Sequence, residues 1–251
     1  MTISKYGDKK VTDLSDWGRP IARIIANFLK DKPVSVIQVT NLHLVLTIYC
    51  SWLILEGSMV TACALLVVKG VIDAVDGELA RIRDKPSHVG RYWDTIADSI
   101  GLFAVMCSFA VVLQWTPYVT GLIILAILFQ YSLFNYYSIA MRSLSLGDTT
   151  SRLDERTKPT AYPWEKQSTV NFFHRIYLLS FSWQDRIIAK LSGKGSESLM
   201  FEFTLSSLLG FGFQSLILLI LALTEQLDHL PELVLLFNSA VMGAVLLRSR
   251  I

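Results

Sequence analysis

The chain has 251 residues, 52% of them hydrophobic, and its mean hydropathy is +0.45. A soluble domain of this length needs far fewer apolar residues to fill its core, so we expect a membrane to be the solvent. The net charge of +2, without a basic run interleaved with aromatic residues, gives no reason to expect nucleic acid as a partner. Cys50, Cys63 and Cys107 lie in apolar runs without the spacing of a zinc or redox site, and we interpret them as small core residues.

The N-terminal segment, residues 1–35, lacks the apolar core and cleavage site of a signal peptide. From Asp13 to Lys30, apolar residues recur every three or four positions opposite basic ones. This pattern predicts an amphipathic helix in the membrane interface, with an ordinary packed helix as the alternative.

Six later segments are long and apolar enough to cross about 30 Å of hydrocarbon, which takes about twenty helical residues. Each must be helical, because unpaired backbone groups are too costly in lipid. The predicted spans are Val36 to Leu55, Ser58 to Val75, Asp94 to Leu113, Tyr118 to Ala140, Phe203 to Leu223 and Pro231 to Leu247.

The basic residues predict the orientation of these spans. All but one of the 23 Lys and Arg residues fall in the N-terminal segment, the second and fourth connections and the C-terminus, and the exception is Lys69. Because positive residues stay in the cytoplasm, we expect both termini to be cytoplasmic. The long connection, residues 143–200, is expected to hold a polar loop from Gly147 to Gln167 and a second surface helix from Phe173 to Leu191.

The fold prediction is therefore an all-α integral membrane bundle of six transmembrane helices with an N-terminal amphipathic helix. It forms a single domain, 1–251, in which residues 36–251 make the bundle.

The most informative stretch is VIDAVDGELARIRDKPSHVGRYWDTIADSI, from Val71 to Ile100. Residues three, four and seven apart share a helix face, and a short connection would make the two helices antiparallel neighbours. Four carboxylates then converge at the cytoplasmic edge of the membrane. They are Asp73, Asp76, Asp94 and Asp98.

Carboxylates gathered at a membrane edge would repel one another unless a cation lay among them. An all-oxygen ligand set favours Mg²⁺ or Mn²⁺, and no His or Cys is placed where zinc would need it. Gly77 and Ala80 leave room for a nucleotide to approach the backbone, and Arg81 suits a diphosphate.

This stretch resembles the signature of the CDP-alcohol phosphotransferase family, DxxDGxxAR followed after eight residues by GxxxDxxxD. The eight matching residues are Asp73, Asp76, Gly77, Ala80, Arg81, Gly90, Asp94 and Asp98. Eight fixed residue types at fixed spacing arise by chance in roughly one window per billion. The six-helix layout with cytoplasmic termini is also similar to that family.

The resemblance implies roles for these residues. Asp73, Asp76 and Asp94 would bind one or two divalent ions, and Asp98 would also lie at the metal site and act as the general base. The residues expected to contact CDP are Thr40, Asp73, Gly77, Ala80, Arg81 and Gly90. Thr40 is included because Gln38-Val39-Thr40 resembles the family's PNxxT segment, although Val36 and Ile37 replace its Pro and Asn.

Several polar residues in the apolar runs are less specific. Arg142 resembles a position that holds an acceptor phosphate in some family members, and a membrane anchor is the alternative. Asn41 and His43 would either line the cleft or bond to neighbouring helices, and the packing role is the preferred interpretation. Lys69 would either extend toward the interface or meet a carboxylate.

The function implied is transfer of a phosphatidyl group from a CDP-alcohol lipid, CDP-diacylglycerol being the expected donor, to a small polar acceptor, with release of CMP. The alternatives are a choline or ethanolamine phosphotransferase that uses diacylglycerol as acceptor and, more distantly, a cation transporter or channel whose carboxylates mark an ion path. The resemblance also implies a homodimer. We expect a multi-pass protein in contact with membrane lipids, in the inner (cytoplasmic) membrane of a bacterium.

Overall fold

The structure is a computed structural model that describes residues 5–6, 11–144, 151–153, 155–192 and 199–249. All the regular structure in these residues is helical, as the sequence predicted. Along the chain the elements are α1 (Arg19–Leu29), α2 (Val36–Leu55), α3 (Met59–Ile82), α4 (His88–Val112), α5 (Pro117–Leu144), α6 (Gln167–Leu191), α7 (Leu199–Ser206), η1 (Ser207–Leu209), α8 (Phe211–Leu223), η2 (Leu227–His229), α9 (Leu230–Glu232), η3 (Leu233–Phe237) and α10 (Asn238–Arg248).

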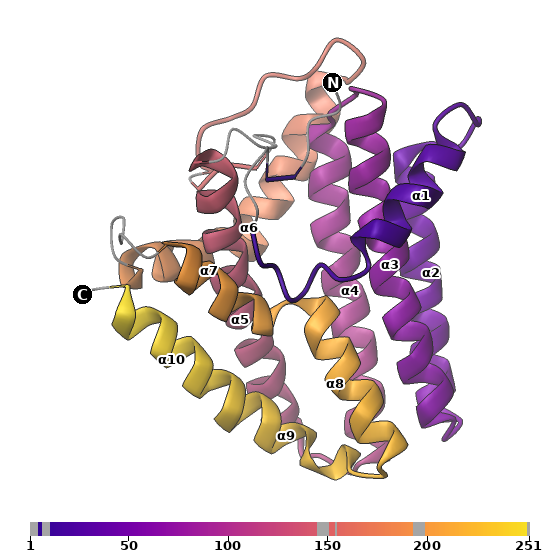
Figure 1. Cartoon of the computed structure of the whole chain (residues 1–251), viewed down its shortest axis with the longest axis vertical. Coiled ribbons are helices and arrows are strands. Elements are labelled where there is room, and N and C mark those ends of the chain that lie inside the picture. Colours follow the sequence, from indigo (N-terminus) through magenta and orange to yellow (C-terminus); the bar gives the residue numbers. More distant parts are fainter. Residues whose placement is uncertain (1–4, 7–10, 145–150, 154, 193–198, 250–251) are drawn as a thin grey trace.

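Three long helices, α2, α3 and α4, run side by side, and α2 packs against both of the others (Figure 1). Local sequence fixes where they begin and turn. Ser35 and Gln38 form a capping box at the start of α2, and the Ser87 hydroxyl accepts from the Gly90 amide at the start of α4. Between α2 and α3 the chain turns at Gly57, whose φ of 79° is unstrained for glycine. The end of α3 and the starts of α2 and α4 therefore meet at one end of the bundle.

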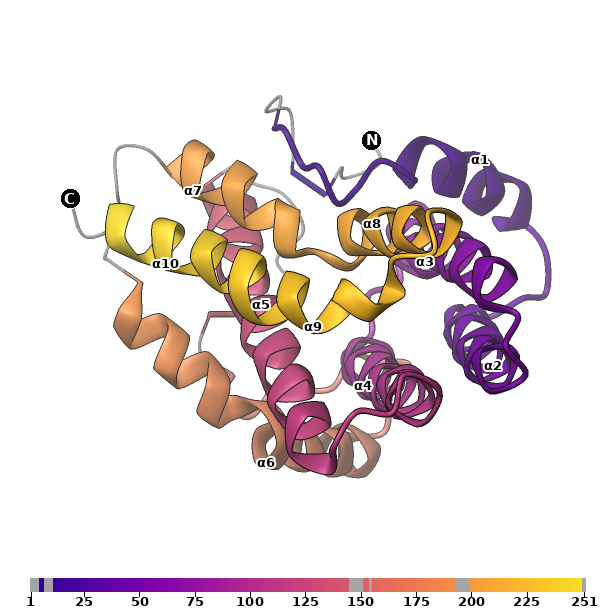
Figure 2. The same cartoon turned by 90° about the horizontal axis from the view of Figure 1, so that it is seen from below.

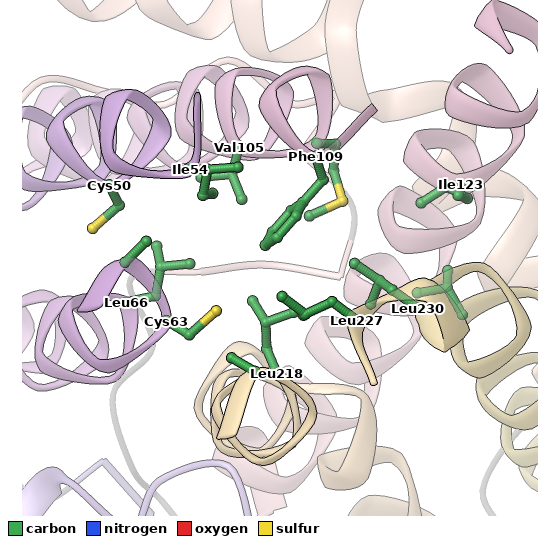
Figure 3. Close-up of a cluster of buried hydrophobic side chains, with 14 of the residues drawn as sticks. Cys50, Ile54, Cys63, Leu66, Val105, Phe109, Ile123, Leu218, Leu227 and Leu230 are labelled. Carbon is green, nitrogen blue, oxygen red and sulfur yellow. The ribbon is translucent and has the colours of Figure 1, made fainter. Parts of the chain in front are cut away.

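A large apolar core occupies the other end of the bundle, where α2, α3, α4, α5 and α8 meet. Figure 3 shows Ile54, Leu66 and Phe109 pointing into the same space from three of these helices. Cys50 and Cys63 are buried there, which confirms their interpretation as core residues. Cys107 is exposed, so the same interpretation was wrong for that residue, which faces out of α4.

Among the residues that the structure describes, four helices are long and apolar enough to cross a membrane, and a fifth span results if a bent pair counts as one. The four are Val36–Leu55, His88–Val112, Pro117–Leu144 and Leu227–Arg248, and the pair is Leu199–Leu209 with Phe211–Leu223, bent by 41°. The helix α3 lies among them but is more charged. The predicted count of six spans therefore stays a prediction.

The last predicted span is interrupted, although the sequence predicted one regular helix there. Residues Leu233–Phe237 form a widened π turn between α9 and α10. The Gln130 side chain donates a hydrogen bond to the Val234 carbonyl at 3.2 Å, and Asn238 donates to Gln130 Oε1 at 3.2 Å. Since a π turn alters the helical hydrogen-bond ladder, this carbonyl can bond a side chain from α5.

The N-terminal helix is shorter than predicted. It begins at Arg19, with Pro20 in its first turn, and it packs against α3 through the buried residues Ala22 and Ala26. Its other face exposes Ile24 and Phe28, each 71% accessible. That exposed apolar face agrees with an interfacial helix, which stays a prediction. Figure 2 shows α1 on the outside of the bundle.

The second surface helix exists as α6, which starts at Gln167, six residues before the predicted start at Phe173. It packs against α4 and α5 (Figure 2). Residues 147–150 and 154 of the predicted polar loop lie outside the described residues. The parts of the loop that are described, 151–153 and 155–166, contain no helix, as predicted.

Candidate active site

The acidic residues predicted from sequence come together where α2, α3 and α4 meet. On α3, Asp73 and Asp76 lie three residues apart, so both face the neighbouring helices α2 and α4. On α4, Asp94 lies on the same side of the bundle. A short connection, residues 83–87, joins α3 to α4, and both helices pack against α2.

His43 on α2 lies at the centre of this group. Its Nε2 atom is 3.2 Å from Asp94 Oδ1, 3.4 Å from Asp73 Oδ1 and 3.9 Å from Asp76 Oδ2. The His43 side chain has no accessible surface. It bonds to the neighbouring helices α3 and α4, as interpreted, and its partners there are three carboxylates of the site. Asn41 is exposed and accepts a hydrogen bond from Trp93 of α4 at 2.8 Å.

Thr40, one turn from Val36 on α2, also belongs to the group. Its buried hydroxyl donates to Asp76 Oδ2 at 2.8 Å. The hydroxyl lies 3.2 Å from the Val36 carbonyl as well. Thr40 therefore orients the Asp76 carboxylate, a role that the sequence pattern alone did not indicate.

Asp98 is linked to Asp73 by a lysine. Its Oδ1 atom accepts a hydrogen bond from the Lys69 ammonium at 2.5 Å, and the same ammonium is 3.4 Å from Asp73 Oδ1. The Lys69 side chain is only 4% exposed, so it meets carboxylates inside the bundle and does not extend to the interface. The structure thus joins Asp73, Asp76 and Asp94 to His43, and it joins Asp98 to Lys69.

The first of these groups fits a divalent cation. Ligand atoms of His43, Asp73, Asp76 and Asp94 all lie within 4.8 Å of one another. The Asp73 Oδ1 atom is buried and accepts no hydrogen bond from the residues that the structure describes. The Lys69 ammonium lies 3.4 Å from this oxygen, so the oxygen does not by itself require a metal ion. The group is compatible with a metal ion because its four ligand atoms lie so close together.

Two cavities adjoin the acidic group. Cavity A, of about 420 Å³, reaches from the group to the start of α4 and the loop near Tyr162. Its walls include all the residues predicted to bind CDP except Asp73, and also the predicted acceptor residue: Thr40, Gly77, Ala80, Arg81, Gly90 and Arg142. The structure therefore places Arg142 on the side of the predicted nucleotide residues.

Cavity B, of about 400 Å³, adjoins cavity A and shares Gly77, Arg81 and Asp94 with it. It also reaches Asp73 and Asp98 and extends to α5 and α6. Its far wall holds Asp185, which accepts hydrogen bonds from Ser132 at 3.1 Å and Tyr177 at 3.1 Å. Burial raises the pKa of Asp185. This wall is polar. It was not predicted, because the sequence pattern of α6 indicates only a surface helix.

The rim of cavity B carries basic residues from the N-terminal segment. Lys5 lies 3.3 Å from both Asp13 and Asp16, and Arg19 pairs with Asp16 and Glu78. Burial alone would raise the pKa of Asp16, but Lys5 and Arg19 hold it below its ordinary value. These ion pairs hold Lys5, Asp13 and Asp16 beside the acidic site.

The long connection between α5 and α6 holds the start of α4 in place. Glu165 accepts hydrogen bonds from the Ser87 hydroxyl at 2.7 Å and the Val89 amide at 2.9 Å. Glu155 binds both terminal nitrogens of Arg91, at 2.5 and 2.9 Å. Neither glutamate stood out in the sequence, because a charged residue in a polar loop is ordinary.

These observations define a helical protein of apolar, membrane-capable spans, with an acidic, metal-compatible centre between two cavities of a size usual for small-molecule ligands. The family model for CDP-alcohol phosphatidyltransferase matches residues 35–194, a range that contains every predicted site residue. The match covers more than half of the chain, which therefore belongs to the CDP-alcohol phosphatidyltransferase family. A comparison with curated proteins gave no match.

Membership implies transfer of a phosphatidyl group from a CDP-alcohol to an alcohol acceptor. The family is in general dependent on divalent metal, and the His and Asp group is compatible with one. The distant alternative, a cation channel or transporter, has no such support.

Proposed function

We propose that the protein transfers a phosphatidyl group from CDP-diacylglycerol to the hydroxyl of a small polar acceptor and releases CMP, as a step in phospholipid biosynthesis. The observation that carries the proposal is the acidic group between two cavities, one of them lined by the predicted CDP-binding residues. A transfer reaction needs this arrangement, since donor and acceptor must reach the same atoms from different sides.

Cavity A supports the donor assignment. Gly77 and Gly90 give its walls little bulk, and Arg81 supplies a guanidinium that suits a diphosphate. Thr40 and Asp76 lie where the cavity meets the acidic group. We propose that cytidine and the diphosphate occupy this cavity, and that the acyl chains extend from the bundle into the membrane.

The carboxylates would hold one or two divalent cations, Mg²⁺ or Mn²⁺, with Asp73, Asp76 and Asp94 as ligands and Asp98 beside them. When bound, the metal would neutralise the diphosphate and stabilise CMP as a leaving group. The protein's own residues then orient the reactants. Thr40 fixes the Asp76 carboxylate, and Lys69 fixes that of Asp98.

Asp98 is proposed as the general base, because it lines cavity B at the border of the acidic group. It would take the proton of the acceptor hydroxyl as the acceptor oxygen bonds to the β-phosphorus of the donor. The bond from that phosphorus to the bridging oxygen breaks, and both of its electrons leave with CMP. Atoms and charge balance without a further reactant.

Cavity B supports a small polar acceptor, because Ser132, Tyr177 and Asp185 present hydroxyl and carboxyl groups at its far wall. Arg142 is proposed to contact the phosphate of an acceptor that carries one. This role requires the acceptor to reach cavity A, where Arg142 lies beside Asn135, a residue that lines both cavities.

One observation favours a second candidate, a phosphotransferase that accepts diacylglycerol. Cavity C, a smaller and mostly apolar space of about 100 Å³, runs from Lys69 and Asp98 to Leu218 and Val234 in the core. An apolar acceptor could present its hydroxyl to Asp98 from this side. The polar cavity B is about four times larger, which favours the polar acceptor.

The remaining proposals concern the membrane. We propose a multi-pass protein in a bacterial inner membrane, with both termini in the cytoplasm, and a homodimer. The supporting observation is that the basic residues gather in the segments that join at the acidic end of the bundle.

The test is CMP release by purified protein in detergent micelles with Mg²⁺ or Mn²⁺. CDP-diacylglycerol is offered with glycerol 3-phosphate, serine, inositol or inositol phosphate, and CDP-choline is offered with diacylglycerol. Acceptor-dependent CMP release that is lost in Asp98→Asn supports the proposal and identifies the acceptor. Release only from CDP-choline would favour the second candidate, and no release with any pair would contradict both. Arg142→Ala should raise KM only for phosphorylated acceptors.

A further inference from the structure

Lys69 places its ammonium between two of the predicted site carboxylates, Asp73 and Asp98. Its ammonium lies 2.5 Å from Asp98 Oδ1 and 3.4 Å from Asp73 Oδ1. Each of these carboxylates therefore already has a cation beside it. The position follows from the sequence, since Lys69 precedes Asp73 by one helical turn.

The ammonium is held firmly in this place. The Lys69 side chain is 4% exposed, and its nitrogen lies 4.4 Å from the centre of the Phe211 ring, from α8. A cation over an aromatic face is attracted to it, so α8 supports the ammonium from the side away from the carboxylates. Withdrawal of Lys69 to make room for an ion would give up two ion pairs and this contact.

The other ligands form a set that suffices for one ion. His43, Asp73, Asp76 and Asp94 offer one nitrogen and three carboxylates within 4.8 Å, and Asp98 is outside this set. Paired metal ions lie about 3.5–4 Å apart, so a second ion bridging Asp73 and Asp98 would collide with the ammonium or be repelled by it. An imidazole among carboxylates also favours Mn²⁺ over Mg²⁺, which prefers oxygen ligands.

We propose that this protein binds a single divalent cation through His43, Asp73, Asp76 and Asp94, and that the Lys69 ammonium replaces a second ion beside Asp98. Lys69 is then a positioning residue that keeps the Asp98 carboxylate off the metal and directed at the acceptor side. The inference rests on the proposed metal-dependent transfer at the same site. It differs from the expectation that Asp98 is a metal ligand.

The test counts bound Mn²⁺ and needs no substrate. Electron paramagnetic resonance of unbound Mn²⁺, in a titration of detergent-purified protein, should give about one ion per chain for the wild type. The nearly isosteric Lys69→Met variant, which lacks the charge, should bind about two, and Lys69→Arg should bind about one. Two ions or none in the wild type, or one in a folded Lys69→Met, would overturn the proposal.

Two matched carboxamide variants and one spectrum keep the test decisive if Lys69→Met does not fold. Asp94→Asn should weaken Mn²⁺ binding at least about tenfold, whereas Asp98→Asn should change it less than about twofold. Nitrogen coupling to bound Mn²⁺ should appear in pulsed spectra of the wild type and vanish in His43→Gln. Equal losses in the two carboxamide variants, or no coupling, would refute the ligand set. One bound Mn²⁺ without CMP release would instead refute only the proposed function.

Discussion

The contact between Gly101 and Thr47 sets the spacing of α2 and α4 one turn below the acidic group. A Cβ atom at position 101 would lie 2.7 Å from the Thr47 methyl carbon. Thr47 is buried and donates from its hydroxyl to the His43 carbonyl at 2.7 Å. Gly101→Ala therefore pushes on the helical turn that carries His43. Close approach at small residues is common between membrane helices.

The size of the effect follows from this distance. Ordinary van der Waals contact begins near 3.4 Å, so the methyl groups must separate by about 0.7 Å. Overpacking of a tight core costs about 1–3 kcal/mol, and the better helix propensity of alanine offsets about 1 kcal/mol. A displacement approaching 1 Å at a site can reduce the rate about 100-fold. We expect a modest loss of stability and a loss of kcat/KM between about 10-fold and 100-fold.

The assay is initial-rate CMP release together with thermal unfolding in the same detergent. Thr47→Ser supplies the matched control, because it removes the methyl group and keeps the hydroxyl bond to the His43 carbonyl. The double variant Thr47→Ser, Gly101→Ala should recover most of the activity lost in Gly101→Ala. Full activity in Gly101→Ala, or no recovery in the double variant, would refute the proposed link between helix spacing and the site.

Three further predictions concern residues around the site. Thr40→Val removes the hydrogen bond to Asp76 and should weaken Mn²⁺ binding about tenfold in an equilibrium titration. Thr40→Ser keeps the hydroxyl and should bind Mn²⁺ as the wild type does. Equal binding by both variants would contradict the role of Thr40 in orienting Asp76. Burial alone would raise the pKa of Glu155, but Arg91 holds it below its ordinary value of 4.5. The pair therefore stabilises the fold above pH 4.5 and loses this effect as the pH falls through the lower folded pKa. Glu155→Gln should lower Tm by roughly 5 °C at pH 7 and by less at pH 4, and a pH-independent difference would contradict the ion pair. The Arg83 guanidinium donates hydrogen bonds to four carbonyls between residues 29 and 34. Arg83→Ala should therefore lower Tm more than Arg83→Lys, which keeps one charged donor group. Equal decreases in Tm would contradict a role for these hydrogen bonds.

Much of the fold could be predicted because apolar length determines where membrane helices lie. The bounds of α2, Val36–Leu55, match the predicted span, and those of α5 differ only at the ends. The prediction failed where side chains from distant segments alter a helix. The π turn at Leu233–Phe237 coincides with hydrogen bonds from Gln130 in α5, which no local pattern shows. Similarly, residues 11–18 form no helix, and two of them, Thr12 and Trp17, form hydrogen bonds with Thr204 of α7 and Gly212 of α8.

Within the site, the four aspartates could be identified because ionised groups in apolar helices are expensive and hence informative. His43 could not be assigned from sequence. It lies alone in an apolar helix, and its three partners come from α3 and α4, so no spacing within α2 marks it. The contacts of Glu155 and Glu165 could not be predicted either. Acidic residues are common in polar loops, and no sequence pattern distinguishes these two from the others.

Lys69 shows how a charged residue can be noticed in a sequence and still not be understood. A lysine in an apolar helix has two low-energy outcomes, because its long side chain can reach the interface or pair with a carboxylate. Which outcome holds depends on α8, whose Phe211 ring covers the side chain. The sequence places α8 more than a hundred residues away, so only the folded bundle shows that Lys69 neutralises Asp98. That contact places a cation between Asp98 and Asp73, and Asp98 lies outside the set of close ligand atoms formed by His43, Asp73, Asp76 and Asp94.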